Sequence, residues 1–490
     1  MSDAARAATQ ARAPLMRPLL FGVFARALPL TMLGPLLPGI ATSLGATLAQ
    51  VGWIVATYAT GSLIAQPIMG RLADERGRKR IFFVCIALFG AGSLASALAT
   101  SLPLLIIGRI VQALGAGGIQ PVATAIIASR LEPQRQGGAI GALYGAFGLG
   151  TMAGALCGGG LVAAAVALAP RTTGWISDDL RGFPWHLVFW LNVLLAIAAA
   201  ALARSLPGDR PRADLRPRGN DPSGIALIVA IAAALMVAAT NPDGIGAWGI
   251  AATIALAALF VIVERRSRAP VIDPALFASR GPALVYWIAL GFGVPSFTLT
   301  IYSATFLIMR YNASPEQAGV ALFALAAAYV ASAIAGGALI SRVNFRALLV
   351  CAACVVALGV FWLAISTSML IAIIAMAVGG IGLGLASAPP NALLLRYVKR
   401  DRAGSATGVA SMLATSGAIT APALIGTFLA HWRSGDAIDA MRAALYACAI
   451  VAALCAALAA TLPEPDDVEE RTGSPDNRSR GVEFVRGMHP

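Results

Sequence analysis

The sequence predicts an all-α integral membrane protein with fourteen membrane-spanning helices. The chain has 490 residues, of which 58% are hydrophobic and only 12% are charged, too few polar residues to coat soluble domains of this size. Its mean hydropathy is +0.78. Uncharged runs of about 20 residues, the length that spans a bilayer, recur from end to end. The runs do not alternate polar and apolar residues, which argues against a transmembrane barrel.

The apolar runs define the fourteen candidate spans, and polar linkers after the sixth and eighth divide them into six, two and six. The spans lie near 18–41, 50–71, 81–100, 103–128, 137–165, 184–205, 222–241, 246–265, 282–308, 315–340, 346–366, 369–395, 403–430 and 441–463. The expected domains are a cytoplasmic N-terminal tail (1–17), an N-terminal six-helix bundle (18–205), cytoplasmic linkers with the two additional helices (206–281), a C-terminal six-helix bundle (282–463) and a disordered cytoplasmic tail (464–490).

The basic residues predict an orientation. A net charge of +13 would suggest nucleic-acid binding in a soluble chain, but membrane proteins concentrate Lys and Arg in cytoplasmic loops. With the N-terminus in the cytoplasm, 29 of the 36 Lys and Arg residues fall in cytoplasmic segments and 5 on the outer side. Adding or removing one span would invert every later loop. We therefore expect an inner-membrane protein with both termini in the cytoplasm and no nucleic-acid partner.

The most charged short stretch is GRLADERGRKR (Gly70–Arg80), between the second and third spans. A loop that follows the positive-inside tendency explains its cations, but not its aspartate or its glycines. An acid flanked by arginines at a helix end can accept their hydrogen bonds or face the N-terminus of another helix, and a glycine lets that helix approach. The stretch therefore predicts a clasp that holds one conformation of a two-state protein. The candidate gating residues are Gly70, Asp74, Arg76, Gly77 and Arg78.

This stretch resembles the G-x-L-x-D-r-x-G-r-r loop between helices 2 and 3 of the major facilitator superfamily. Further motifs occur in that family's order. They are RIVQALGAGGIQP (109–121) in the fourth span, GTMAGALCGGGL (150–161) in the fifth and WHLVFWLNV (185–193) at the start of the sixth. The run from NDPSG to VIVERRSRAPVIDPALF is similar to the two added helices of the fourteen-span drug exporters, the QacA/EmrB-like branch. The segment RAGSATGVASMLATSGA (402–418) is similar to helix 13 of that branch.

The resemblance implies two six-helix bundles around a central cavity, with two additional helices beside them. It implies the export of small organic molecules in exchange for protons, with the proton gradient as the energy source and no cofactor. It also implies a proton-coupling or network role for Arg109, with Gln112; a structural arginine bonded to backbone carbonyls or to Gln112 is the alternative. The helix-5 exporter motif falls on four glycines, for which ordinary close packing is the alternative to a gating role. They are Gly150, Gly154, Gly158 and Gly159.

A weak internal repeat accompanies the resemblance. GALISRVNFR (Gly337–Arg346) closes the tenth span, and its glycine and leucine match those of the stretch after Gly70. Ser341 replaces the aspartate, and Asn344 replaces the second glycine. Internal duplication is typical of secondary transporters.

The first span departs from the branch, because it contains Arg26 and lacks the usual aspartate. Arg26 either snorkels to the cytoplasmic interface, is structural, or faces the cavity and attracts an anionic substrate. Only Arg26 and Arg109 are charged well within spans, and no acid lies deep in any span. Such a cavity would favour neutral or anionic compounds over lipophilic cations. Further candidates for the cavity wall, with membrane-interface anchoring as the alternative, are Tyr58, Tyr144 and Tyr302.

No motif indicates an enzyme. The chain has no phosphate-binding Gly-x-x-x-x-Gly-Lys-Ser/Thr, no His-Glu-x-x-His zinc spacing and no nucleophile with His and acid partners. The alternatives to a proton-coupled exporter are an importer or exporter of one specific, anionic metabolite on the same fold, and a non-transporting membrane sensor. The expected partners are a small-molecule substrate and the lipid bilayer. The oligomeric state stays open, with a monomer as one alternative.

Overall fold

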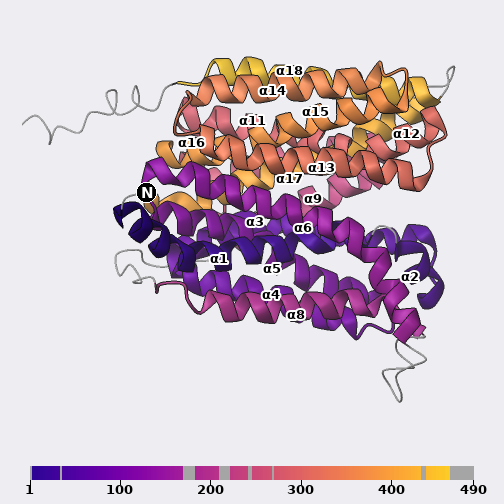
Figure 1. Cartoon of the computed structure of the whole chain (residues 1–490), viewed down its shortest axis with the longest axis horizontal. Coiled ribbons are helices and arrows are strands. Elements are labelled where there is room, and N and C mark those ends of the chain that lie inside the picture. Colours follow the sequence, from indigo (N-terminus) through magenta and orange to yellow (C-terminus); the bar gives the residue numbers. More distant parts are fainter. Residues whose placement is uncertain are drawn as a thin grey trace, which may run out of the picture.

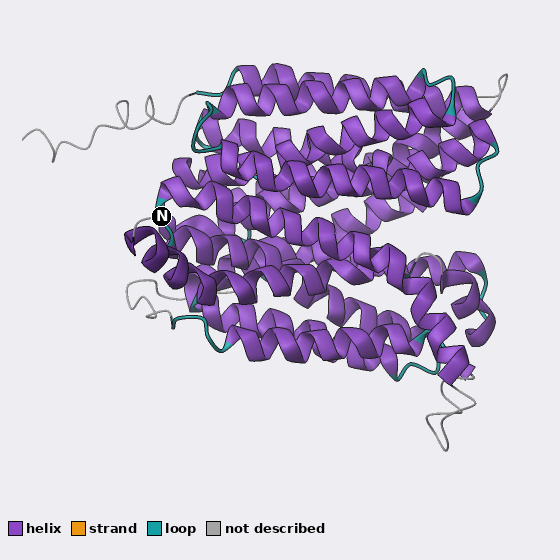
Figure 2. Ribbon diagram, viewed as in Figure 1, coloured by secondary structure: helices purple, strands orange, loops and turns teal. Residues whose placement is uncertain are grey.

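The helices lie side by side along one long axis and form two halves, one from each end of the sequence (Figure 1). The computed structural model describes residues 3–33, 36–168, 182–208, 221–240, 245–267, 270–431 and 437–463. Over these ranges the chain is helical, with short connections and no strand (Figure 2). This architecture confirms the all-α fold class. The tail predicted over 464–490 lies outside the described residues, as do 209–220 of the first linker.

Each predicted span coincides with a helix or with a run of helices. The N-terminal half contains α1 (Asp3–Met32), α2 (Leu37–Leu44), α3 (Leu48–Arg76), α4 (Arg78–Ala97), α5 (Leu102–Arg130), α6 (Pro133–Leu168) and α8 (His186–Ala203). The additional helices are α9 (Pro222–Thr240) and α10 (Ile245–Arg266). The C-terminal half contains η3 (Pro274–Phe277), α11 (Arg280–Phe297), the π-helical η4 (Thr298–Tyr302), α12 (Ser303–Tyr311), α13 (Pro315–Leu339), α14 (Phe345–Ala364), α15 (Met369–Ser387), α16 (Pro389–Tyr397), η5 (Arg400–Arg402), α17 (Ala403–His431) and α18 (Ala437–Ala460).

Among the described residues, nine helical stretches are long and apolar enough to cross a membrane. They support a multi-pass membrane protein. Crossing by the remaining helices, and with it the count of fourteen spans, stays a prediction. The additional helices α9 and α10 pack against each other, and α9 also contacts α3 of one half and α17 of the other.

Prolines explain where three predicted spans depart from a single straight helix. The first span divides because α1 ends at Met32, shortly before Pro35. The twelfth divides at Ala388, just before two consecutive prolines. In the ninth, Pro295 precedes the π-helical turn of η4. A proline removes one backbone donor and crowds the preceding turn, so the helical ladder has to change at each of these places.

The two halves meet at two close helix crossings, α3 with α17 and α6 with α13. A Cβ atom on Gly70 would lie 2.1 Å from the carbonyl oxygen of Gly404. At the second crossing, a Cβ atom on Gly141 would lie 2.7 Å from the Cα atom of Gly337. Glycine is therefore required at both crossings for the backbones to approach this closely. The leading glycines of the sequence repeat, Gly70 and Gly337, mark one crossing each.

The crossing of α6 and α13 gives a matched test. We expect Gly141→Ala to cost about 1–3 kcal/mol by overpacking, which would lower the midpoint of thermal unfolding by about 1–3 °C. Gly138→Ala is the control, because it lies three residues earlier on α6 and a Cβ atom there meets nothing within 4 Å. Differential scanning fluorimetry of the purified protein measures both. Equal midpoints for the two variants would contradict the close crossing.

Candidate functional site

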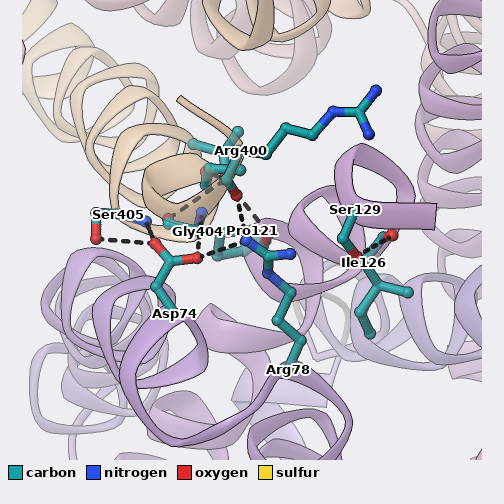
Figure 3. Close-up of polar contacts among 10 residues, drawn as sticks. Asp74, Arg78, Pro121, Ile126, Ser129, Arg400, Gly404 and Ser405 are labelled. Atoms are coloured by element: carbon teal, nitrogen blue, oxygen red, sulfur yellow. Dashed lines mark hydrogen bonds and ion pairs between the residues drawn. The ribbon is translucent and has the colours of Figure 1, made fainter. Parts of the chain in front are cut away.

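The Asp74 carboxylate binds the first turn of a helix in the opposite half (Figure 3). Oδ1 accepts a hydrogen bond from the N–H of Gly404 at 3.0 Å. Oδ2 accepts from the N–H and the hydroxyl of Ser405 at 2.7 and 3.0 Å. These N–H groups have no partner within α17, and the dipole of the helix favours a negative charge at this end. Asp74 therefore caps α17 from outside its own half. We call this contact the clasp.

Arg78 closes the clasp from its other side. Its Nη2 lies 3.1 Å from Oδ1 of Asp74 and also donates to the carbonyl of Arg400 (Figure 3). Gly77 makes the turn between α3 and α4 with a φ of 99°, a conformation that favours glycine. Arg76 is exposed. The structure thus joins Arg78 directly to the Asp74–α17 contact, gives Gly77 a role in the turn, and leaves Arg76 at the surface.

The titration of Asp74 reflects opposing influences. Asp74 lies beyond the predicted span 50–71, yet its side chain is only 6% exposed. This burial raises the pKa of the carboxyl above its ordinary value, whereas Arg78 and the N–H groups of Ser405 and Gly404 act in the opposite direction. Protonation would leave the carboxyl with one fewer acceptor and no charge to pair with Arg78. The clasp is therefore a contact that a proton can weaken.

The linker after α10 is tied to both halves beside the clasp. Arg71 of α3 donates to the carbonyl of Pro270 and pairs with Glu75 at 2.7 Å. Arg402, which precedes α17, pairs with Asp273 at 2.8 Å. The additional helices are thereby connected to the same end of the molecule that the clasp closes.

Arg109 lies deep in the N-terminal half, with 1% of its surface exposed. Its Nη1 donates to Gln112 Oε1 at 2.5 Å, and its Nε donates to the carbonyl of Ile54 at 3.3 Å. Gln112 in turn donates to Ser93 Oγ at 2.8 Å. The guanidinium also lies over the ring of Tyr58, 4.0 Å from its centroid. Arg109 is therefore bonded to Gln112. These contacts fit a purely structural arginine as well as one that takes part in a proton-coupling network.

Arg26 points into the protein. Its Nη1 donates to the carbonyl of Ala116 and its Nη2 to Gln120 Oε1, both at 3.0 Å. The guanidinium lies 5.0 Å from the ring centroid of Phe147. Ala116 is in the middle of α5, so the side chain does not snorkel to the end of its helix. The hydroxyl of Tyr58 donates to the Arg26 carbonyl at 3.2 Å, which links this arginine to the environment of Arg109.

Three side-chain bonds between the halves were not expected from the sequence. Asn391 Nδ2 of α16 donates to the hydroxyl of Tyr144 on α6 at 2.7 Å. Gln66 Nε2 of α3 donates to Thr415 Oγ1 of α17 at 3.0 Å. The hydroxyl of Thr407 lies 3.3 Å from the carbonyl of Pro121. Buried amides within apolar runs are the one sequence signal that marks Gln66 and Asn391.

Tyr302 stands apart from these contacts. It lies in η4, and no described polar contact joins it to Arg26, Tyr58 or Tyr144. Tyr58 therefore bonds to the backbone of Arg26, Tyr144 bonds across the halves to Asn391, and Tyr302 makes neither contact.

The glycines of the helix-5 motif lie against α1. A Cβ atom on Gly150 would lie 2.5 Å from the carbonyl of Phe24, and one on Gly154 would lie 2.2 Å from that of Leu28. Close packing of α6 on α1 therefore accounts for both glycines. Gly158 and Gly159 lie in α6, in a part whose side-chain surroundings are outside the described set.

Two helical halves, joined at one end by breakable polar contacts and holding buried arginines, form the architecture of a multi-pass membrane transporter. No group of His, Cys, Asp and Glu in the described part of the chain could hold a metal ion. The chain belongs to the major facilitator superfamily, whose family model matches residues 19–311 and 282–486. It is a transporter of small molecules and not an enzyme.

Relatives agree with this membership. The chain is 27% identical over 423 residues to the multidrug resistance protein Stp of Mycobacterium tuberculosis, covering 84% of this chain and 75% of Stp. It is 26% identical over 439 residues to the multidrug transporter protein MdtP of Bacillus subtilis, covering 87% of this chain and 76% of MdtP.

Solved structures show the same fold. The human organic anion transporter MFSD10 (TETRAN) superposes with a TM-score of 0.66 at 15% identity, covering 91% of this chain and 99% of that one. The proton:xylose symporter XylE superposes with a TM-score of 0.64 at 14% identity, covering 93% and 98%. At these identities the likeness concerns the arrangement of helices alone.

The clasp predicts the effect of removing one charge. Asp74→Asn should weaken the closed arrangement by about 2 kcal/mol, because charge-assisted bonds to α17 and Arg78 become neutral or are lost. Spin labels can be attached at the exposed positions Arg80 and Lys399, one in each half. Double electron–electron resonance should then show a second population in which the two labels lie farther apart. Glu75→Gln is the control, because Glu75 pairs within its own helix. Unchanged distances in Asp74→Asn would contradict the clasp.

The Arg109 environment predicts a loss of stability. Gln112→Leu removes the acceptor of the Arg109 Nη1 and leaves a buried cation short of a partner, so we expect unfolding to become easier by about 2–3 kcal/mol. Ser93→Ala removes the hydrogen bond that Gln112 donates to Ser93 but leaves the Arg109–Gln112 bond in place, so it should destabilise the protein less. Unfolding in mixed detergent micelles compares the two. A Gln112→Leu variant as stable as the unmodified protein would show that Arg109 does not depend on this bond.

Proposed function

We propose that the protein is a proton-coupled exporter of small organic compounds, of the fourteen-span, QacA/EmrB-like kind. The observation that carries the proposal is the clasp, a titratable carboxylate that closes one end of the molecule between two halves. The similarity to Stp and MdtP, whose names describe multidrug transport, supports export and a broad range of compounds.

In the proposed cycle, the two halves rock about a central site. The present structure holds the halves together at the end that carries Asp74, and the distribution of Lys and Arg predicts that this end faces the cytoplasm. Opening that end requires Asp74 to release Gly404 and Ser405. A proton on Asp74 removes its charge, so protonation favours release, and loss of the proton favours closure. The protein would work in the inner membrane with both termini in the cytoplasm.

The charge of the site favours neutral or anionic cargo. Arg26 and Arg109 are both buried in the N-terminal half, and the tyrosine between them carries no charge at neutral pH. The Nε atom of Arg26 is buried and has no hydrogen-bond partner among the described residues. A carboxylate, sulfonate or strong neutral acceptor would satisfy this donor, whereas a lipophilic cation would be repelled. The unpaired donor of Arg26 favours a second candidate function, which is the transport of one specific anionic metabolite on the same fold.

Vesicles with an imposed pH gradient test the proposal. Inside-out membrane vesicles that contain the protein should accumulate a dye or drug when their interior is acidic, and should lose it when a protonophore collapses the gradient. Uptake in right-side-out vesicles driven by an inward proton gradient would support an importer instead. Absence of gradient-driven movement for every compound that the host strain resists would favour the sensor alternative.

Arg26 gives the test of cargo charge. In a strain that lacks the native gene, Arg26→Gln should reduce resistance to anionic compounds about tenfold and leave resistance to neutral compounds largely intact, because one cation contributes about 1.4 kcal/mol to binding an anion at close range. Arg26→Lys is the control, since it keeps the charge. Equal export of anions and cations by the native protein and by Arg26→Gln would refute the charge assignment.

A further inference from the structure

A second basic site lies mostly on the C-terminal half, and its lining shares no residue with the clasp or the buried arginines. A pocket of about 350 Å³ opens where α13 ends and α14 begins, bounded by α16, the end of α18 and the start of α6. This volume lies within the roughly 300–1,000 Å³ range of small-molecule sites. The pocket is lined by Gln134, Ile340, Ser341, Arg342, Val343, Asn344, Phe345, Arg346, Leu393, Arg396, Leu462 and Pro463.

Three arginines surround this pocket, and its lining contains no acid. Arg346 is positioned by hydrogen bonds to the carbonyl of Leu462. Arg396 lies over the ring of Phe345, 4.5 Å from its centroid. Both guanidinium groups are therefore held in place, and Arg342 completes the set from the connection between α13 and α14. The positive-inside tendency explains basic residues on this face, but it does not explain why three of them share one cavity.

The sequence repeat explains how the excess of positive charge arises. In the first copy, which starts at Gly70, the two residues after Ala73 are Asp74 and Glu75, and both pair with arginines. In the second copy, which starts at Gly337, the same two positions are Ser341 and Arg342. The second copy thus kept its glycine crossing while it lost both carboxylates and gained a cation. The lining offers this excess charge no carboxylate partner, so an anion from outside the lining can bind there.

The donors indicate the class of that anion. Each planar guanidinium binds two oxygens in parallel, and a phosphate group has enough oxygens to pair with more than one arginine at once, whereas one carboxylate has only two oxygens and a halide has none. The pocket also has apolar walls, formed by Ile340, Val343, Leu393 and Leu462. Since it lies at the ends of membrane helices, phosphate could arrive free in solution or as the headgroup of an anionic lipid.

We propose that Arg342, Arg346 and Arg396 form a binding site for a phosphate group, made of other residues than the clasp and the buried arginines. The site is independent of the cargo of the transporter, so its test is a binding measurement and not a transport assay. Arg342 and Arg396 are exposed, and replacing them leaves the Arg346–Leu462 contact intact.

The experiment uses the full chain, purified in detergent, as native protein and as Arg342→Gln/Arg396→Gln. Isothermal titration with inorganic phosphate tests the free ion, and native mass spectrometry with phosphatidylglycerol, against phosphatidylcholine, tests the headgroup. We expect the double variant to bind whichever probe the native protein binds about 30-fold more weakly, because each basic residue near such a headgroup contributes about a fivefold step. Binding of phosphate alone identifies a soluble ligand, and binding of phosphatidylglycerol in preference to phosphatidylcholine identifies a lipid.

The matched control is Arg265→Gln/Arg266→Gln, which removes the same charge from exposed arginines at the end of α10. An equal loss in the control would overturn the proposal, because it would reduce the effect to general surface charge. Failure of the native protein to bind either probe would also overturn it. A third variant neutralises Glu464, Asp466, Asp467, Glu469 and Glu470. Binding that appears only in this variant would show that the chain supplies its own anion, and would overturn an external ligand.

Discussion

One carboxylate bound to the N-terminal N–H groups of a helix in the other half is the contact on which the closed arrangement depends. Asp74 satisfies donors of Gly404 and Ser405 that α17 cannot satisfy internally. Its strength comes from charge as well as from geometry, so it is reversible: a proton on Asp74, or a movement of α17, removes it without unfolding either half. The close crossing of Gly70 and Gly404 brings the two helices near enough for these bonds to form.

The buried cations form a second constraint. Arg26 and Arg109 are bonded to backbone carbonyls and to the amides of Gln120 and Gln112 instead of to carboxylates. Amides satisfy the donors of a guanidinium but do not cancel its charge. Among the described residues, these two positive charges in the N-terminal half therefore have no carboxylate partner.

The sequence was sufficient to predict the all-helical fold, the approximate position of each span, and Asp74 with Arg78 as polar residues near the end of α3, because apolar runs, glycines and a charged loop are local signals. It gave the N-terminus of another helix as one of two possible partners for Asp74. It could not identify that helix, since the pairing of α3 with α17 joins segments more than 300 residues apart. The bonds Tyr144–Asn391 and Gln66–Thr415 were missed for the same reason. The snorkelling interpretation of Arg26 was wrong, because a local spacing rule cannot show that α5 offers nearer acceptors.

The most direct test asks whether α3 and α17 must separate during transport. In a background without the six native cysteines, Gln66→Cys and Thr415→Cys can be joined by a short bis-methanethiosulfonate cross-linker, which forms a disulfide with each cysteine and is removed by reduction. Their native side chains are hydrogen-bonded across the halves at 3.0 Å. The account predicts that the linked protein stops transporting, and that reduction of the linker restores transport. Full transport by the linked protein would contradict it, because the halves would then not need to part at this crossing.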